Sequence, residues 1–533
     1  MAAAVALTCT ASASAANGAW TKQAGIKRLH FETAPISIRP GQNTVDNVTV
    51  PASEKPSVDG YLVRMKPDLQ YLNGKVPPVD VIHLHHGVWL NATGSSPASP
   101  FGAIEPIFFG GEEKTVFNIP KGYGYAYRAR DTWILNQMIH NNTANAAKVK
   151  LVWDLDFIPA TAPLAKKVKA VTPLWMDVRR GWGYPVFDTI RGAGGTDGEY
   201  TFPQDEKTSP YRLTDIQNEF TMPWSGTIVS AVGHLHPGGL RDDIDVIRSG
   251  ATPPTGRACR TAATNITGTR AVRRCVTATR GMSAGSTRIF RTQAKYYDPA
   301  GPVSWDVSLT ASRPDWRVRV NTGDTIRIST TYENKLSSWY ENMGLALLYV
   351  AKDDTTGLDP FATPVDWRGV LTHGHLPENN NHGGAASGLA DPRKTASGPT
   401  TTEVDIKNYQ FRPGDLGLLS TGGKVPTVPE GQRLKFVNQD NAAYEWHSIT
   451  TCAAPCNRQT GISYPLANAS NARATNSFLQ LDSGQLGFGP AGASPAANRL
   501  DYETPADLPK GTYTYFCRVH NFMRGSFRVI DPL

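Results

Sequence analysis

Short runs of alternating apolar and polar residues, interrupted at frequent turn residues, are the feature of this chain that most limits its possible folds. Gly occurs 49 times and Pro 39 times among 533 residues. Alternation with a period of two is typical of strands with one buried face, and Gly and Pro mark the turns between them. Long amphipathic helical patterns are scarce. The sequence therefore predicts an all-β protein built of β-sandwiches.

The chain is too long for one hydrophobic core, so we expect several domains. The polar, Gly-rich segment RGAGGTDGEYTFPQDEKTSP indicates one boundary, and the stretch from Glu378, rich in Asn, Gly, Ala, Ser and Pro, indicates another. We predict an N-terminal β-sandwich over residues 17–195, a second over 196–352, a His-containing linker over 353–400 and a final domain over 401–533.

The first residues look like a secretory signal. A short apolar run ends at the small residues Ala13-Ser14-Ala15-Ala16, so we expect cleavage that removes residues 1–16. No later apolar stretch is long enough to span a bilayer. We therefore expect an exported protein, extracellular or periplasmic.

The cysteines agree with export. Cys259 with Cys275, and Cys452 with Cys456, form two local pairs that would close short loops. Disulfides of this kind form in oxidising compartments, and neither pair has the partners of a zinc site.

The net charge of +8 is modest for this length. Lys and Arg are scattered, and no basic run is interleaved with aromatic residues. A solvated surface explains this charge, and we expect no nucleic-acid partner.

The most specific motif lies near the C-terminal end, where Cys517, His520 and Met523 are spaced as Cys-x2-His-x2-Met between two strand-like segments. Copper that carries one electron needs ligands that suit both Cu(I) and Cu(II), namely two imidazoles, a thiolate and a weak axial thioether. His447 ends a strand-like segment and supplies the missing imidazole. We predict a type 1 copper held by these four residues. The alternative is a buried free Cys beside an incidental His and Met.

This region resembles the plastocyanin–amicyanin group of cupredoxins, and its ligand loop is most similar to that of amicyanin. The resemblance covers about the last quarter of the chain. It implies a Greek-key β-sandwich that transfers electrons. It also implies that His520 lies near the surface, where electrons would enter the copper site. A copper oxidase such as a nitrite reductase is disfavoured, because those enzymes carry a His beside the ligand Cys, whereas Phe516 and Arg518 flank Cys517.

Histidines also gather in the first two domains. His234 and His236 are two residues apart in SAVGHLHPGG, so they project from the same face of a strand and can chelate one metal. Adjacent His85 and His86 would point to opposite faces, so both could bind one metal only at a bulge or a strand end. His140 ends the run WILNQMIH. A single histidine is more often a packing residue than a ligand, but repeated pairing favours metal binding.

The order of these pieces resembles the copper type II ascorbate-dependent monooxygenases: a His pair, a single His, His-x-His, and then a Met in a strand. The strongest local match is VNTGDTIRISTTYENK followed by YENMGLALLYV. The resemblance covers residues 25–352. It implies a dioxygen-using enzyme with two type 2 coppers.

The resemblance also implies a ligand set for each of these coppers. The electron-accepting copper would be held by His85, His86 and His140, and His83 could replace one of the pair. The catalytic copper, where dioxygen binds and hydrogen is abstracted, would be held by His234, His236 and Met343. A core methionine is the alternative for Met343.

Three positions depart from the peptide-amidating members of that family. Val232 stands where those enzymes have the Arg that holds the substrate carboxylate, and Leu345 and Leu347 replace their Asn and Tyr. None of these three side chains could bind the C-terminal carboxylate of a peptide. We therefore expect a different organic substrate, either apolar or anchored in another way.

The segment THGHLPENNNHGG places His373, His375 and His382 at the start of the linker. A third copper site, a fold-back that supplements a site in the first domain, and a solvated loop all fit this pattern.

Together these features predict an exported copper-dependent monooxygenase that hydroxylates a C–H bond with dioxygen. Its electrons would come from an ascorbate-like reductant or a redox protein, through the tethered type 1 copper. The alternative is a non-enzymatic copper-binding or electron-transfer protein.

Overall fold

The computed structural model of the chain describes residues 25–532 apart from 80, 95–98, 100–103, 180–184, 209–212, 214–215, 265–269, 278–284, 298–305, 336–337, 377–389, 441–444, 453, 455–480, 488–498 and 521. The expected signal over residues 1–16, His382 and Cys456 therefore lie outside the described residues.

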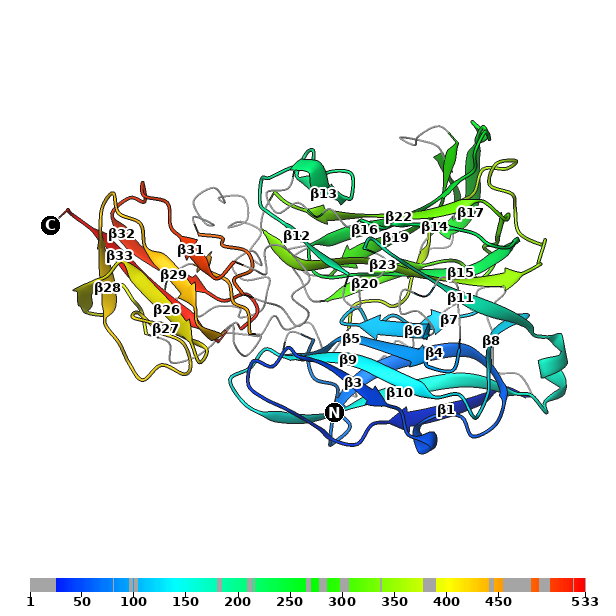
Figure 1. Ribbon diagram of the computed structural model, residues 1–533, viewed down its shortest axis with the longest axis horizontal. Helices are drawn as coiled ribbons and strands as arrows, with labels where there is room; N and C mark the ends of the chain where they lie inside the picture. Colours follow the sequence, from blue (N-terminus) through cyan, green and yellow to red (C-terminus); the bar gives the residue numbers. More distant parts are fainter. Residues whose placement is uncertain are drawn as a thin grey trace, which may run out of the picture.

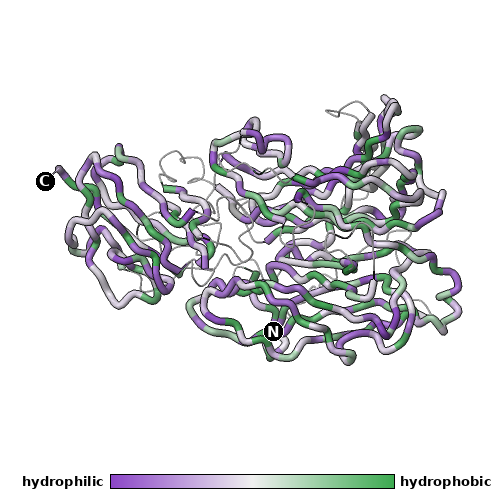
Figure 2. Tube along the Cα trace, viewed as in Figure 1, coloured by the Kyte–Doolittle hydropathy of each residue, from purple (hydrophilic) through white to green (hydrophobic). Residues whose placement is uncertain are grey.

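The described residues form strands joined by loops and by three short 3-10 turns, η1 (Ala52–Glu54), η2 (Pro163–Lys167) and η3 (Glu206–Thr208). No α-helix occurs among them, which confirms the all-β prediction. Within these ranges, no helix is long and apolar enough to cross a membrane. Figure 2 shows how apolar and polar residues alternate along many of the strands.

The first sandwich consists of two sheets (Figure 1). One is antiparallel, in the order β3 (Val45–Thr49), β9 (Trp133–Asn141), β5 (Ile82–Asn91) and β6 (Glu105–Gly111). The other is built around β10 and contains β1 (Lys27–Glu32), β2 (Ile36–Ile38), β4 (Gly60–Tyr71), β7 (Phe117–Asn118), β8 (Tyr123–Tyr127) and β10 (Ala147–Pro159).

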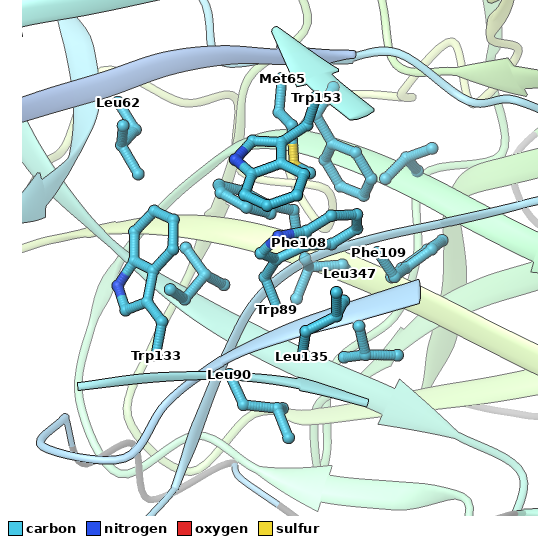
Figure 3. Packing of buried hydrophobic residues seen from close by; sticks show 14 of the residues in the cluster. Leu62, Met65, Trp89, Leu90, Phe108, Phe109, Trp133, Leu135, Trp153 and Leu347 are labelled. Atoms are coloured by element: carbon cyan, nitrogen blue, oxygen red, sulfur yellow. The ribbon is translucent and has the colours of Figure 1, made fainter. Parts of the chain in front are cut away.

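Large aromatic side chains fill the space between these two sheets. The rings of Trp89 and Trp153 lie 5.5 Å apart edge to face, and Phe108 packs against both Trp89 and Trp133. Figure 3 shows this group in the centre of the cluster. Burial of such large side chains is a main source of stability in a sandwich.

The second sandwich also consists of two sheets. One contains β11 (Lys169–Asp177), β12 (Val186–Thr189), β15 (Gly226–Leu235), β20 (Val307–Ala311), β21 (Val318–Val320), β23 (Trp339–Lys352) and β24 (Val370–Leu371). The other contains β13 (Glu199–Phe202), β14 (Glu219–Thr221), β16 (Gly239–Ile247), β19 (Ser286–Tyr296) and β22 (Thr325–Glu333). The hairpin of β17 (Arg257–Thr264) and β18 (Arg270–Thr277) carries the predicted disulfide Cys259–Cys275.

Strand β11 belongs to both sandwiches. Its first residues, from Lys169 to Val171, pair in parallel with β8, and the rest, from Thr172 to Asp177, pair antiparallel with β23. The two sandwiches also share one hydrophobic cluster, and the Tyr349 hydroxyl of β23 donates a hydrogen bond to the Ile107 carbonyl of β6. The faces that carry the candidate histidines are therefore held against each other.

The third sandwich lies beside the ends of the first two in Figure 1. One of its sheets runs in the order β25 (Ser397–Thr400), β28 (Val425–Pro429), β33 (Arg524–Ile530), β32 (Gly511–Phe516) and β30 (Thr450–Cys452). The other runs β27 (Gln410–Arg412), β26 (Glu403–Lys407), β29 (Lys435–Asn438) and β31 (Asp501–Glu503). Phe436 and Phe411 pack edge to face on Tyr515 in the core between them.

Candidate metal centres

Three side chains of the third sandwich converge in a triangle. His447 Nδ1 lies 3.2 Å from His520 Nδ1, and Cys517 Sγ lies 4.0 Å and 3.7 Å from these two nitrogens. Metal–nitrogen and metal–sulfur bonds of about 2.0–2.3 Å in a near-trigonal plane produce donor triangles of this size. This buried His-Cys-His cluster could hold a metal ion, and it suggests a type 1 copper; its residues are three of the four predicted from the sequence.

The backbone around Cys517 shapes this cluster. Cys517 follows β32 directly, and the short loop that it opens returns to β33. The amides of Ser448 and His520 both donate hydrogen bonds of 3.4 Å to Cys517 Sγ. Hydrogen bonds to a ligand sulfur stabilise its thiolate form and tune the potential of a bound copper.

The outer nitrogen of each imidazole is also hydrogen bonded. His447 Nε2 donates to Asp440 Oδ2 at 3.0 Å, and His520 Nε2 donates to the Gly41 carbonyl at 2.9 Å. Such bonds fix the ring orientation and leave Nδ1 directed at the centre. His520 was expected near the surface, but it is only 1 % exposed, because Gly41 of the first sandwich covers it.

Electrostatics favour a thiolate in this cluster. Burial raises the pKa of Cys517, but hydrogen bonds from His447 and His520 outweigh burial and hold the pKa well below its ordinary value. Burial lowers the pKa of His447, and the hydrogen bonds to Asp440 and Cys517 more than offset it, raising the pKa to about 9. A preformed thiolate suits a soft, redox-active metal such as copper, which would have to displace a proton from His447 on binding.

Met523 lies in the same ligand loop. It is fully buried, its amide donates a 2.8 Å hydrogen bond to the His520 carbonyl, and it belongs to the hydrophobic cluster that contains Cys517. Its role as the axial thioether stays a prediction.

A second group of histidines gathers where the first two sandwiches meet. All six are buried, and they come from three strands or their ends: His83, His85, His86, His140, His234 and His236. We refer to these residues as the six-histidine cluster.

A β-bulge allows His85 and His86 to lie together. Leu84 pairs with Ile139 of β9, but His86 pairs with Met138, so His85 is an extra residue in β5. As a result the Nδ1 atoms of the two histidines lie 3.3 Å apart, although the residues are adjacent in sequence. This is the bulge that an adjacent pair of ligands requires.

His85 occupies the middle of the cluster. Its ring centroid lies 4.4 Å from that of His140 and 4.3 Å from that of His236. The two expected ligand sets are therefore contiguous rather than separate. Among the described residues, only His447, Cys517 and His520 bring three ligand atoms within 4.8 Å of one another, and no three members of the six-histidine cluster do so.

Hydrogen bonds orient the members of the His-x-His pair. His234 Nδ1 lies 3.1 Å from Glu113 Oε2, and His236 Nδ1 donates to the Glu341 carbonyl at 2.6 Å. Both Nε2 atoms are buried without a hydrogen-bond partner among the described residues. An imidazole tied at one nitrogen and unpaired at the other is typical of a metal ligand.

Burial keeps five members of the cluster uncharged, because it lowers the pKa of each. It lowers the pKa of His83 to about 3 and that of His86 to about 4. Burial, together with the neighbouring histidines, also lowers the pKa values of His85, His140 and His236 well below the ordinary range. Neutral imidazoles are the form that binds metals, so these rings need lose no proton at neutral pH to do so.

A small cavity opens beside the cluster. Its volume is about 30 Å³, enough for a water or a diatomic gas. His86, His234 and Met343 contribute to its wall, and its other lining residues are Val88, Phe109, Gly110, Asn136, Trp175, Pro185 and Leu345. The wall is mainly apolar, so the ligand most compatible with it is small and uncharged.

Tyr332 joins the strands that carry the candidate catalytic ligands. Its buried hydroxyl accepts hydrogen bonds from the amides of His236 and Met343 and donates one to the Met343 carbonyl. The position of Met343 relative to His236 is thus set by one side chain of β22.

The linker histidines fold back toward the first two domains. His373 Nε2 donates a 2.5 Å hydrogen bond to the carbonyl of Glu113, the residue whose carboxylate contacts His234. His375 pairs with the Asp306 carboxylate and lies 5.5 Å from the Tyr297 ring. The segment therefore supports the surroundings of His234, and metal binding by these histidines stays a prediction.

Sequence reasoning missed the residues that orient the ligands. Glu113 and Tyr332 act between domains or across sandwich layers, and Gly41 meets its partner at a separation of 479 residues, whereas Asp440 lies 7 residues before His447. No local motif marks them. The adjacent acids Glu112 and Glu113, which follow β6, are the one sequence signal that could have pointed to Glu113. The structure buries both side chains, which is unusual for acids.

No family model matches the chain, and no curated protein matches it. Among solved structures, a copper-containing nitrite reductase (NirK) from Thermus scotoductus SA-01 is similar over 57 % of this chain and 57 % of that protein, with 15 % sequence identity and a TM-score of 0.14. The chain thus spans somewhat more than half the length of that enzyme. At this identity and TM-score the likeness says nothing about the function of this chain, which must be inferred from its candidate metal centres.

Proposed function

We propose that the chain is an exported copper-dependent monooxygenase that hydroxylates a C–H bond of an organic substrate and carries its own type 1 copper electron donor. The observation that carries the redox assignment is the buried triangle of His447, Cys517 and His520. Its donor set suits one-electron copper chemistry.

Two features support a second, dioxygen-using centre. Six buried histidines gather beside an apolar cavity, and Met343 contributes a thioether to its wall. Thioether ligands favour Cu(I), the state that reacts with dioxygen. In this proposal His85, His86 and His140 hold the copper that accepts electrons, whereas His234, His236 and Met343 hold the copper at which the substrate is hydroxylated.

The reaction balances as R–H plus dioxygen, two electrons and two protons giving R–OH plus water. An ascorbate-like reductant or a redox protein supplies the electrons, one at a time, to the third sandwich. The small apolar cavity favours an uncharged reacting group, and Val232 and Leu345, both buried, offer no clamp for a carboxylate.

A non-enzymatic copper-binding or electron-transfer protein is the second candidate. One observation favours it: the type 1 triangle is the one group of three converging ligand atoms among the described residues. In that case the six-histidine cluster would be a buried neutral network.

Copper stoichiometry and electron paramagnetic resonance separate the two. The monooxygenase should bind one type 1 and two type 2 coppers, and it should couple ascorbate oxidation to oxygen uptake when a suitable C–H substrate is added. Cys517→Ser and Met343→Ile variants would assign the signals. A single blue copper in fully loaded protein would rule out the enzyme and leave the electron carrier.

A further inference from the structure

The third sandwich is fastened to the other two next to its copper ligands. His520 reaches the first sandwich at Gly41, and Arg518, which follows Cys517, reaches the second sandwich at Ser338 and Trp339. Both contacts are buried, so they define one docked position for the type 1 site.

The contact at Gly41 is close. His520 Nε2 donates to the Gly41 carbonyl at 2.9 Å, and Tyr409 packs edge to face on the His520 ring. Gly41 has a φ of +64°, and a Cβ there would lie 2.5 Å from Tyr409 Cε1 and 3.0 Å from His520 Cδ2. Only glycine allows the two domains to approach this closely.

The turn at Gly41 is hydrogen bonded to the end of β9. The Asn141 amide donates to the Gln42 carbonyl at 3.0 Å, and the Gly41 amide donates to the Thr143 carbonyl at 3.1 Å. The Asn141 side chain also donates to the Arg39 carbonyl at 2.8 Å. Since Asn141 follows His140 directly, the turn connects His520 to a member of the six-histidine cluster.

We infer that the Gly41–Gln42 turn is an internal route for electrons from the type 1 copper to the copper bound at His140. The route consists of two hydrogen bonds, from His520 to Gly41 and from Asn141 to Gln42, and the main-chain bonds between them. With copper held at both places, His447, Cys517 and His520 would hold the donor and His140 would help to hold the acceptor, so one electron would pass from the reduced metal to the oxidised one and no proton would need to move. This inference rests on the proposed function.

The second contact holds this route in place. The Arg518 guanidinium stacks 4.4 Å above the Trp339 ring, and its Nη1 donates to the Ser338 carbonyl at 2.6 Å. Asp482 Oδ2 of the third sandwich accepts the Ser338 amide at 2.8 Å. A cation–π contact, one buried hydrogen bond and one partly buried hydrogen bond oppose rotation of the domain away from this position. Transfer should therefore occur within the docked molecule, without a diffusive step.

A steric variant tests the route. Gly41→Ala forces His520 and Tyr409 away from the turn, and Gly74→Ala is the matched control, because Gly74 also has a positive φ but nothing lies within 4 Å of its Cβ position. In fully copper-loaded protein, the type 1 copper is reduced by a pulse and the return of its blue absorption is followed. Wild type and Gly74→Ala should recover with a first-order rate independent of protein concentration. Gly41→Ala should recover slower by about tenfold or more, as expected for a misplaced donor.

A second variant changes no copper ligand, and its readout needs no bound copper. Arg39→Glu replaces the cation that lies 3.8 Å from Glu445 with a like charge. Amide hydrogen exchange in metal-free protein should then become faster over residues 41–43 and 518–520, by about tenfold for a loosened interface, while the rest of the third sandwich keeps its protection. Unchanged exchange would contradict the docked interface.

The outcomes separate this inference from the function on which it rests. A recovery rate that depends on protein concentration, or a Gly41→Ala rate equal to wild type with an unchanged blue spectrum, would overturn the internal route and leave the monooxygenase standing. Wild-type protein that binds only the blue copper would remove the acceptor, and both proposals would fall together.

Discussion

At the scale of single residues, the candidate centres depend on side chains that do not themselves point at a metal. Asp440 orients His447, Glu113 orients His234, and the carbonyl of Glu341 orients His236. Glu341 adopts a φ of +51°, an uncommon conformation for a residue with a side chain, and its carbonyl is directed at His236. The backbone strain at Glu341 is thus tolerated where it fixes the orientation of the His236 ring.

Glu113→Gln should weaken copper binding at the His234 site. The amide can still accept a hydrogen bond from His234 Nδ1, but an amide oxygen is a weaker acceptor than a carboxylate oxygen and holds the ring less firmly, so the affinity should fall by about tenfold. Titration against a competing chelator measures it. Glu112→Gln is the control, because that buried side chain does not contact His234 and burial, with Glu113 nearby, raises its pKa well above the ordinary range. Equal affinities in both variants would contradict an orienting role for Glu113.

Glu105 should make folding stability depend on pH. Burial raises its pKa to about 7, although Tyr125 donates a 2.7 Å hydrogen bond to it. Because the pKa is raised in the folded state, its contribution is fully present below about pH 4.3 and is lost as pH rises through about 7. The loss amounts to about 3 kcal/mol. Urea unfolding of wild type and Glu105→Gln between these pH values should show a slope in wild type that the variant lacks.

At the scale of elements, the ligand loop and the bulge show what local sequence can and cannot specify. The spacing of Cys517 and His520 in one short loop between two strands identified two members of the triangle, and His447 at the end of another strand-like segment was predicted as the third. The adjacent pair His85–His86 required a bulge, and β5 has one there. That His85 would also contact His236 was not predictable, because this contact depends on how two sandwiches pack.

Tyr332 should prove important to both stability and copper binding. Tyr332→Phe leaves the buried amides of His236 and Met343 without an acceptor, which should lower the free energy of unfolding by about 1–3 kcal/mol. Cu(I) affinity should fall as well, because the position of Met343 is released. Tyr296→Phe, which removes one hydrogen bond to Gly239, is the matched control in β19. Denaturant unfolding and Cu(I) competition would measure the two effects, and a loss of stability without a change in Cu(I) affinity would separate Met343 from the metal.

At the scale of the whole molecule, three sandwiches are joined in a fixed arrangement with two candidate centres. The all-β class followed from alternation and turn residues, which act locally. The docking of the third sandwich did not, because the Gly41 contact and the Arg518–Trp339 stack join residues far apart in sequence. From the sequence we expected only a linker over residues 353–400 before the last domain, and the structure adds a buried interface at the ligand loop.

In copper-loaded protein, Cys517→Ser should remove the blue absorption expected of the third sandwich and leave the two proposed type 2 coppers in place. The thiolate belongs to the third sandwich alone, and the six-histidine cluster lies in the other two. Optical and paramagnetic resonance spectra of the copper-loaded variant provide the measurement. Loss of the type 2 signals as well would mean that the centres are not independent.

The strand that pairs with both β8 and β23 has a mechanical consequence. Parting the first two sandwiches would break main-chain hydrogen bonds on one side of β11 or the other, in addition to exposing the cluster that they share. Opening the seam between these two sandwiches is therefore expensive in free energy. In the proposed enzyme, reactants would have to reach the cluster without such an opening, so molecular size would limit which substrates could enter.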